Sequence, residues 1–320
     1  MNEKAMYIFY PTNKKNLTYF VNTKLHLSKE ITILNFPPEE DFLDKRQDFM
    51  KAFDNKSNNY IIMSWLGGSI QSKNYTNSCL EIVLALSEDD WVAIKGSTNT
   101  ILVGYSDITI LHCEMLNHGI CSIYGPNFYP FLKSNDKEMR YMLQSIYKIF
   151  NKRDFCINLR KGKKEQTINP GVGTGRLIGG NLHTLFDLQR TKPEYMVKRQ
   201  RNDLIFLEDV ETYYKKREND ISSLQAYRYK YLSEHGFFDD ISGLIIGRTK
   251  YPHVQYGNQA VRYATEDEER ICIKDILQSL DIDKIPVIVN IACSHIFPML
   301  SLPLGRICTL DSEKCILKVH

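Results

Sequence analysis

The sequence lacks the features that mark secreted, membrane-spanning and metal-dependent proteins. Its 320 residues include eight cysteines, but there is no Cys-x-x-Cys pair and no spacing with the eight histidines that fits a zinc site. The His-Glu-x-x-His motif of zinc peptidases and the phosphate-binding P-loop are both missing. No apolar run follows Met1–Lys4, so no signal peptide is expected. The longest apolar stretch, 286–305, contains Asn290, His295 and prolines, which a membrane span would not tolerate.

Composition places the chain among ordinary globular proteins. Hydrophobic residues make up 43% and charged residues 25%, and the formal net charge is only +3, so neither a nucleic-acid polymer nor a membrane surface is expected as a partner. Cysteines within apolar runs suit buried thiols in a reducing compartment, and we expect a cytosolic protein. The basic clusters 160–164 and 198–201 are interpreted as solvated surface, with attraction of an anionic substrate group as the alternative.

The first half alternates short β runs with amphipathic helices, the pattern of a parallel sheet covered by helices. Strands are predicted at 31–34, 60–66 and 101–103, and a helix is predicted from about 107 to 117. Another helix is expected to begin at Asn135, because Glu138 three residues later completes a capping box.

The pattern weakens from about 155 to 175, where the chain becomes polar and basic and contains proline and glycine. We therefore predict an N-terminal domain at 1–155, a linker at 156–175 and a C-terminal domain at 176–320. The C-terminal half has strand-like runs, and between the first two of them a helix is expected. The runs are 204–207, 244–246 and 287–291, and the helix spans about 221–234.

A serine lies directly after one of the predicted strands. The run 101–103 leads through Gly104-Tyr105 to Ser106 and Asp107, and a helix is expected to follow. This order exposes a hydroxyl at the carboxyl end of a sheet and places the N–H groups of a helix start beside developing negative charge. Ser106 is therefore a candidate nucleophile, although serine and aspartate are also common helix N-caps.

A serine nucleophile needs a base, and His295 is the best candidate because it follows the strand-like run 287–291. A buried, hydrogen-bonded histidine with no catalytic role is the alternative. His112 and His118 fall on the helix expected after Ser106, where packing is a sufficient explanation for them.

A third group should orient the imidazole and stabilise its cation. Glu208 ends the run 204–207 and would emerge at a strand end, but Asp209 and Glu211 are competitors that position alone does not exclude. Gly67-Gly68, after another buried run, would allow close backbone approach and supply an oxyanion-hole N–H.

These residues lie in blocks whose order resembles the LD-carboxypeptidase family of serine peptidases, which includes microcin C immunity peptidases. The resemblance runs from about Glu40 to the C-terminus, and its most distinctive blocks are Val-Gly-Tyr-Ser-Asp-Ile-Thr at 103–109 and Gly-Arg-Leu-Ile-Gly-Gly-Asn-Leu at 175–182. The other blocks are 67–68, 124–126, 204–209, 238–247, 285–287, 293–295 and 298–305.

The resemblance implies an α/β protein with an N-terminal flavodoxin-like parallel-sheet domain and a C-terminal swivelling β/α domain. It further implies a homodimer, an active site between the domains, and no metal or organic cofactor. The substrate would be a peptide or a peptidyl-nucleotide, hydrolysed through an acyl-enzyme. By resemblance the triad is Ser106, Glu208 and His295, which selects Glu208 over its acidic neighbours.

The resemblance also assigns the surrounding residues. Backbone N–H groups of Gly68 and Asp107 would form the oxyanion hole, and Gly67 and Asn181 would line the substrate cleft. Tyr124 departs from the family pattern, since it stands where histidine is common before Gly-Pro. The microcin-immunity branch carries a Trp-rich insertion before its Gly-Gly-Asn-Leu block, whereas the stretch 158–166 is short, basic and without tryptophan.

Two other functions fit parts of this pattern. A binding protein on the same fold would sequester a peptide or nucleotide conjugate without cleaving it, as the altered N-terminal and cleft regions suggest. A standard α/β-hydrolase would cleave simple esters, but the sequence around Ser106 fails Gly-x-Ser-x-Gly at its last position.

Overall fold

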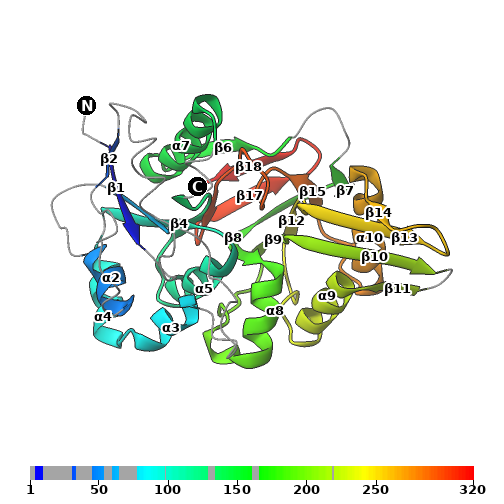
Figure 1. Ribbon diagram of the computed structural model, residues 1–320, viewed down its shortest axis with the longest axis horizontal. Coiled ribbons are helices and arrows are strands. Elements are labelled where there is room, and N and C mark those ends of the chain that lie inside the picture. Colours follow the sequence, from blue (N-terminus) through cyan, green and yellow to red (C-terminus); the bar gives the residue numbers. More distant parts are fainter. Residues whose placement is uncertain are drawn as a thin grey trace.

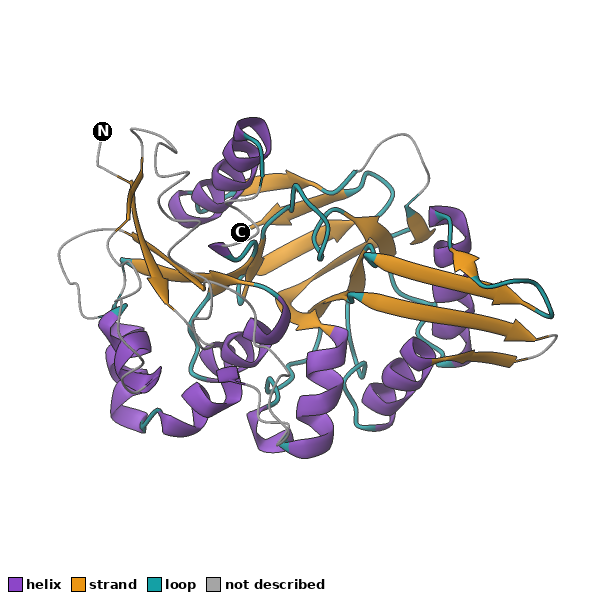
Figure 2. Ribbon diagram, viewed as in Figure 1, coloured by secondary structure: helices purple, strands orange, loops and turns teal. Residues whose placement is uncertain are grey.

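The computed structural model describes residues 4–9, 31–33, 45–53, 60–64, 78–97, 99–128, 134–160, 166–217 and 220–320 (Figure 1, Figure 2). These residues form a six-stranded, an eight-stranded and a four-stranded sheet, with helices packed around them. The predicted α/β class is thereby confirmed. None of the described helices is long and apolar enough to cross a membrane.

The six-stranded sheet has the order β16-β5-β4-β3-β1-β2. Its strands are β1 (Lys4–Phe9), β2 (Ile31–Ile33), β3 (Tyr60–Ser64), β4 (Thr100–Gly104), β5 (Ser122–Tyr124) and β16 (Leu302–Leu304). All neighbours are parallel except β16, which returns from the far end of the chain and pairs antiparallel with β5. The order 2-1-3-4-5 is that of a flavodoxin-like sheet, so the predicted topology of this part is also confirmed.

Helices lie on both sides of this sheet, with α7 above it and α2 to α5 below it in the view of Figure 1. They are α2 (Lys45–Lys51), α3 (Ser78–Ala85), α4 (Glu88–Gly96), α5 (Thr109–Asn117) and α7 (Asp136–Asn151). The 3-10 turn η1 (Ser106–Ile108) leads directly into α5. Helix α7 begins as predicted, since the Asn135 side chain accepts from the backbone of Glu138 and the Glu138 carboxylate accepts from Asn135.

The eight-stranded sheet has the order β6-β18-β17-β8-β9-β12-β15-β7. Its strands are β6 (Phe155–Asn158), β7 (Thr167–Asn169), β8 (Val172–Asn181), β9 (Leu204–Glu208), β12 (Gly243–Gly247), β15 (Val287–Ile291), β17 (Ile307–Asp311) and β18 (Ile316–Val319). The central strands β8, β9, β12 and β15 are parallel. Every residue of β9, β12 and β15 is buried, as expected for parallel strands covered on both faces.

The helices of this half are α8 (Leu182–Thr191), η2 (Pro193–Tyr195), α9 (Leu224–Glu234) and α10 (Glu266–Ser279). The segment 156–175, where the linker is predicted, contributes β6, β7 and the start of β8 to the eight-stranded sheet. The crossing between the two halves therefore contains ordered strands, and the domain boundaries stay a prediction.

A four-stranded sheet extends to the right in Figure 1, beyond α9 and α10. Its order is β11-β10-β13-β14, with β10 (Glu211–Arg217), β11 (Asp220–Ser223), β13 (Tyr251–Tyr256) and β14 (Arg262–Tyr263). The helix predicted from about 221 is wrong at its start: residues 220–223 pair antiparallel with β10, and α9 begins only after Ser223, which caps it. Pairing with a neighbouring strand thus overrides the local helical pattern.

Candidate active site

Ser106 stands where β4 ends and the turn into α5 begins. Its backbone φ is +64°, an uncommon conformation for a residue with a side chain. Hydrogen bonds hold this conformation at both ends: the Ser106 N–H donates to the Tyr124 hydroxyl at 3.1 Å, and the Thr109 hydroxyl donates to the Ser106 carbonyl at 2.6 Å. Strain that is held in this way is typical of functional sites.

The residue before the serine is fixed by Asn127, which is only 1% exposed. The Asn127 side-chain oxygen accepts the Tyr105 N–H at 3.1 Å and the Ser64 hydroxyl at 2.6 Å. Because Ser64 ends β3 and Tyr105 follows β4, this amide ties the carboxyl ends of β3 and β4 together.

Glu208 ends β9 and is 2% exposed. One carboxylate oxygen, Oε2, accepts from His295 Nδ1 at 2.8 Å. The other, Oε1, accepts from the Tyr124 hydroxyl at 2.6 Å and from the Asn181 side-chain amide at 2.9 Å. Burial raises the pKa of Glu208, but the nearby His295 and these three hydrogen bonds outweigh it and leave the pKa below its ordinary value. The carboxylate is therefore held as an anion.

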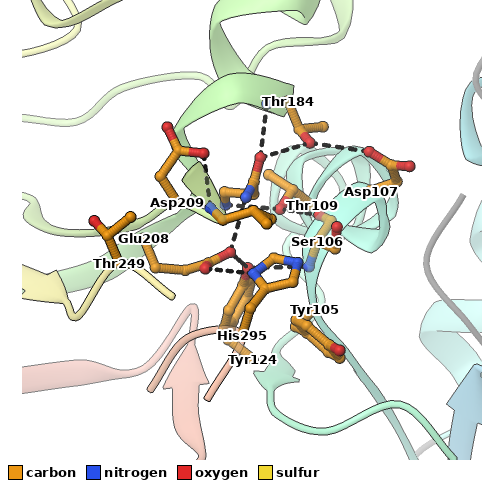
Figure 3. Close-up of polar contacts among 12 residues, drawn as sticks. Tyr105, Ser106, Asp107, Thr109, Tyr124, Thr184, Glu208, Asp209, Thr249 and His295 are labelled. Carbon is orange, nitrogen blue, oxygen red and sulfur yellow. Dashed lines mark hydrogen bonds and ion pairs between the residues drawn. The ribbon is translucent and has the colours of Figure 1, made fainter. Parts of the chain in front are cut away.

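His295 lies in the loop after β15, and its side chain is 12% exposed. The loop packs closely on the end of β12, because a Cβ at Gly247 would come within 2.1 Å of the Cys293 carbonyl oxygen. The Tyr105 ring meets the imidazole edge to face, with ring centroids 4.6 Å apart. In Figure 3 the imidazole lies between the Glu208 carboxylate and the turn that carries Ser106.

The structure separates the candidates that the sequence left open. Asp209 accepts from Arg228 at 2.6 Å in a buried ion pair, and Glu211 is exposed at the start of β10. Of the three acids, Glu208 is the one hydrogen-bonded to His295.

The histidines of the first half have structural surroundings. His112 is fully buried in α5, where burial lowers its pKa to about 4 although a hydrogen bond to the Gly104 carbonyl opposes the shift. The neutral ring donates from Nε2 to that carbonyl at 3.0 Å, so Nδ1 accepts from the Ser122 hydroxyl at 2.8 Å. His118 caps the end of α5 and stacks on Trp91 at 4.6 Å. Both residues pack as the sequence suggested.

Asn181 joins the two halves of the site. Its backbone N–H donates to the Thr109 hydroxyl at 2.9 Å, and its side-chain oxygen caps α8 by accepting from the Thr184 N–H at 2.9 Å. The preceding Gly180 has φ +152°, and a Cβ there would lie 2.6 Å from the Thr109 side chain. The Asn181 amide thus contacts Glu208 as well as lining the cleft.

A cavity of about 730 Å³ opens beside these residues. Ser106, Asp107 and Asn181 line it, together with residues of α8, β10 and α9. The Asp107 carboxylate accepts from the Thr184 hydroxyl at 3.1 Å. Gly67 and Gly68, predicted for the oxyanion hole and the cleft, lie outside the described residues.

Tyr124 is a polar residue of the site to which the sequence reasoning did not assign a role, as are Thr109, Asn127 and Thr184. The sequence marks it only as a departure from the family pattern, whereas the structure places its hydroxyl between Ser106 and Glu208 (Figure 3). Among the described residues, no group of three or more His, Cys, Asp or Glu side chains is arranged to hold a metal ion.

Comparison with known proteins identifies the family of the chain. Residues 39–125 match the LD-carboxypeptidase N-terminal domain and residues 174–310 match the LD-carboxypeptidase C-terminal domain. The chain belongs to the LD-carboxypeptidase family.

Individual relatives fall within the same family. The microcin C7 self-immunity protein MccF of Escherichia coli is 26% identical over 277 residues, which cover 79% of this chain and 71% of that protein. A structure of MccF in complex with glutamyl sulfamoyl guanosine superimposes with a TM-score of 0.74 at 21% identity, covering 100% of this chain and 96% of MccF. The muramoyltetrapeptide carboxypeptidase of Oxalobacter formigenes gives a TM-score of 0.69 at 17% identity, covering 98% of each chain.

Proposed function

We propose that this protein is a serine peptidase or amidase in which Ser106 is the nucleophile, His295 the general base and Glu208 the residue that orients the base. The observation that carries the proposal is the part-buried Glu208–His295 hydrogen bond of 2.8 Å, placed beside a strained serine that lines a cavity. Family membership supports the same chemistry.

The hydrogen-bond pattern favours this division of roles. Because the ionised Glu208 accepts from His295 Nδ1, that nitrogen carries the proton and Nε2 keeps its lone pair. Nε2 takes the Ser106 hydroxyl proton as Oγ attacks the amide carbonyl, and later gives it to the leaving amine. In the second step His295 takes a proton from water, which attacks the acyl-enzyme, and the proton returns to Ser106 as the acyl bond breaks. Glu208 stabilises the imidazolium in both steps.

Negative charge on the attacked carbonyl oxygen needs donors. Asp107 is in the first turn after the nucleophile, where backbone N–H groups point away from the helix that follows. We assign one oxyanion donor to the Asp107 N–H and the other to the N–H of Gly68, as the family resemblance implies.

The substrate is proposed to be a peptide or a peptidyl-nucleotide with one scissile amide. The relatives support these two classes: structures of MccF hold glutamyl sulfamoyl guanosine or aspartyl sulfamoyl adenosine, and another structural neighbour is a muramoyltetrapeptide carboxypeptidase. A cavity of about 730 Å³ is in the range of small-molecule and short-peptide sites. The homodimer and the cytosolic location stay predictions from the sequence.

Two substrates and one variant test the proposal. The purified protein and Ser106→Ala are incubated with a murein tetrapeptide and with a peptidyl-adenylate conjugate, and the products are followed by mass spectrometry. Cleavage of one substrate by the wild type alone supports the serine mechanism and identifies the substrate class. Equal cleavage by Ser106→Ala would contradict it. Saturable binding without any product would instead favour a binding protein on this fold.

A further inference from the structure

We infer that Tyr124 is a positioning residue that links the backbone of the nucleophile to the carboxylate of the triad, and that it acts through Glu208. This inference rests on the proposed function. Tyr124 ends β5 and is fully buried. Its ring packs edge to face on Phe206 with centroids 5.0 Å apart, and His112 lies against it at 5.8 Å. The hydroxyl therefore has little freedom to move.

The direction of both hydrogen bonds follows from the donors available. A tyrosine hydroxyl has one proton to donate and lone pairs to accept with. The Ser106 N–H can only donate, so the hydroxyl oxygen accepts from it at 3.1 Å. Burial and the charge of Glu208 raise the pKa of Tyr124 well above its ordinary value, so the proton stays on the hydroxyl and is donated to Glu208 Oε1 at 2.6 Å.

These hydrogen bonds fix the orientation of the Glu208 carboxylate. Tyr124 and Asn181 both donate to Oε1, which leaves Oε2 directed at His295. The two neutral donors thus occupy Oε1, Oε2 remains to accept from His295, and the bonds favour the charged form of Glu208. Rotation of the carboxylate away from the imidazole would break both bonds to Oε1.

The bond from the Ser106 N–H to Tyr124 also bears on which N–H groups form the oxyanion hole. Because the Ser106 N–H is turned inward to Tyr124, it does not face the carbonyl that the hydroxyl attacks. In chymotrypsin-like sites the N–H of the nucleophile itself is an oxyanion donor. In this protein that task passes to other N–H groups, in agreement with the assignment to Asp107 and Gly68.

The test compares three side chains at position 124. Wild-type protein, Tyr124→Phe and a protein with 3-fluorotyrosine at position 124 are treated with a fluorophosphonate probe, and the rate of Ser106 labelling is measured from pH 4 to pH 9. Tyr229→Phe is the matched control, since it also removes a fully buried hydroxyl, one that makes no hydrogen bond within the described part of the chain. Thermal melts verify that each protein is folded.

We expect opposite effects from the two replacements. Tyr124→Phe removes a bond that lowers the pKa of Glu208, so labelling slows about 10-fold or more and its acidic limb moves to higher pH. The more acidic 3-fluorotyrosine is a stronger donor and moves the limb to lower pH. Tyr229→Phe keeps the wild-type profile. A merely structural role for Tyr124 would not place the three pH profiles in the order of the hydrogen-bond donor strength at position 124. Identical pH profiles in the three proteins would overturn the inference.

A second measurement does not depend on the reactivity of Ser106. The proton between His295 Nδ1 and Glu208 gives a downfield NMR signal in protein with labelled histidine, and we expect Tyr124→Phe to shift it while Tyr229→Phe does not. If the probe labels the wild type but the NMR signal and the labelling rates are the same in Tyr124→Phe, the proposed function stands and this inference fails. If nothing labels Ser106 yet the signal follows Tyr124, the positioning role stands and the proposed function fails.

Discussion

Glu208 and Asp209 are adjacent, both are buried, and each is paired with a basic side chain, yet their surroundings differ in kind. Glu208 accepts three hydrogen bonds, and its pKa lies below the ordinary value. For Asp209, burial raises the pKa, and the charge of Glu208 adds to it, so that Arg228 and one backbone N–H do not restore the ordinary value. In Glu208 the charge of His295 and three hydrogen bonds together outweigh burial and favour the anion, whereas in Asp209 the charge of Arg228 and one backbone N–H do not.

The two acids also face different partners. Consecutive residues of an extended chain point to opposite sides, so Glu208 meets His295 and Asp209 meets Arg228 of α9. We interpret the first pair as catalytic and the second as structural. Replacing the carboxylate by an amide should therefore lower mainly the rate of catalysis at position 208 and mainly the stability at position 209.

The largest expected effect is on turnover in Glu208→Gln. The amide keeps the shape of the carboxylate but neither holds the required imidazole tautomer nor stabilises its cation, so we expect kcat to fall by about 10³- to 10⁴-fold while the protein remains folded. Steady-state hydrolysis and a thermal melt measure both quantities. A variant with wild-type kcat would show that Glu208 is not the triad acid.

Asp209→Asn should show the reverse pattern. It leaves the guanidinium of Arg228, whose side chain is 6% exposed, buried without its counter-charge. The free energy of unfolding, measured by urea denaturation, should fall by about 3–5 kcal/mol, with a much smaller change in kcat than in Glu208→Gln. The double variant Asp209→Asn/Arg228→Met is the control and should recover part of that loss. No change in stability would contradict a structural ion pair.

Glu269 extends the comparison to a buried acid with still fewer donors. One of its oxygens accepts the Thr249 N–H at 3.1 Å, and the other has no hydrogen-bond partner in the part of the chain that the structure describes. Burial raises its pKa to about 7, against which Thr249 and Arg248 act only in part. A raised pKa means that the folded state holds a proton that the unfolded state has released.

Stability should therefore fall as pH rises from the ordinary pKa of Glu269 toward its folded value, by up to about 3 kcal/mol. Glu269→Gln cannot release a proton and should lack this part of the pH dependence. Urea denaturation of both proteins at pH 5 and pH 8 measures the difference. Parallel pH profiles in the two proteins would show that Glu269 keeps an ordinary pKa.

The sequence predicted the elements that depend on local pattern. The strands around 60–64, 204–208, 243–247 and 287–291 and the capped start of α7 were all predicted near their observed bounds. Residues 221–223 were assigned to a helix because their strand pairing depends on β10, which no local pattern shows.

The residues of the site were likewise predictable from the sequence only in part. Ser106, Glu208 and His295 each follow an apolar run that the sequence shows, but Ser106 follows a strand of the six-stranded sheet and the other two belong to the eight-stranded sheet, so their meeting depends on how the two sheets pack. Choosing Glu208 over Asp209 from position alone was impossible, because it depends on which side of the strand faces the loop of His295. The contact of Tyr124 with Glu208, 84 residues apart in the chain, arises only when β5 and β9 are brought together.

The rate of hydrolysis of one amide substrate by three proteins tests the central claim most directly. On whichever of the two substrates the wild type cleaves, the triad predicts that Glu208→Gln is slower by about 10³- to 10⁴-fold and that Ser106→Ala is at least as slow. Rates of Ser106→Ala or Glu208→Gln equal to that of the wild type would contradict catalysis by Ser106, His295 and Glu208.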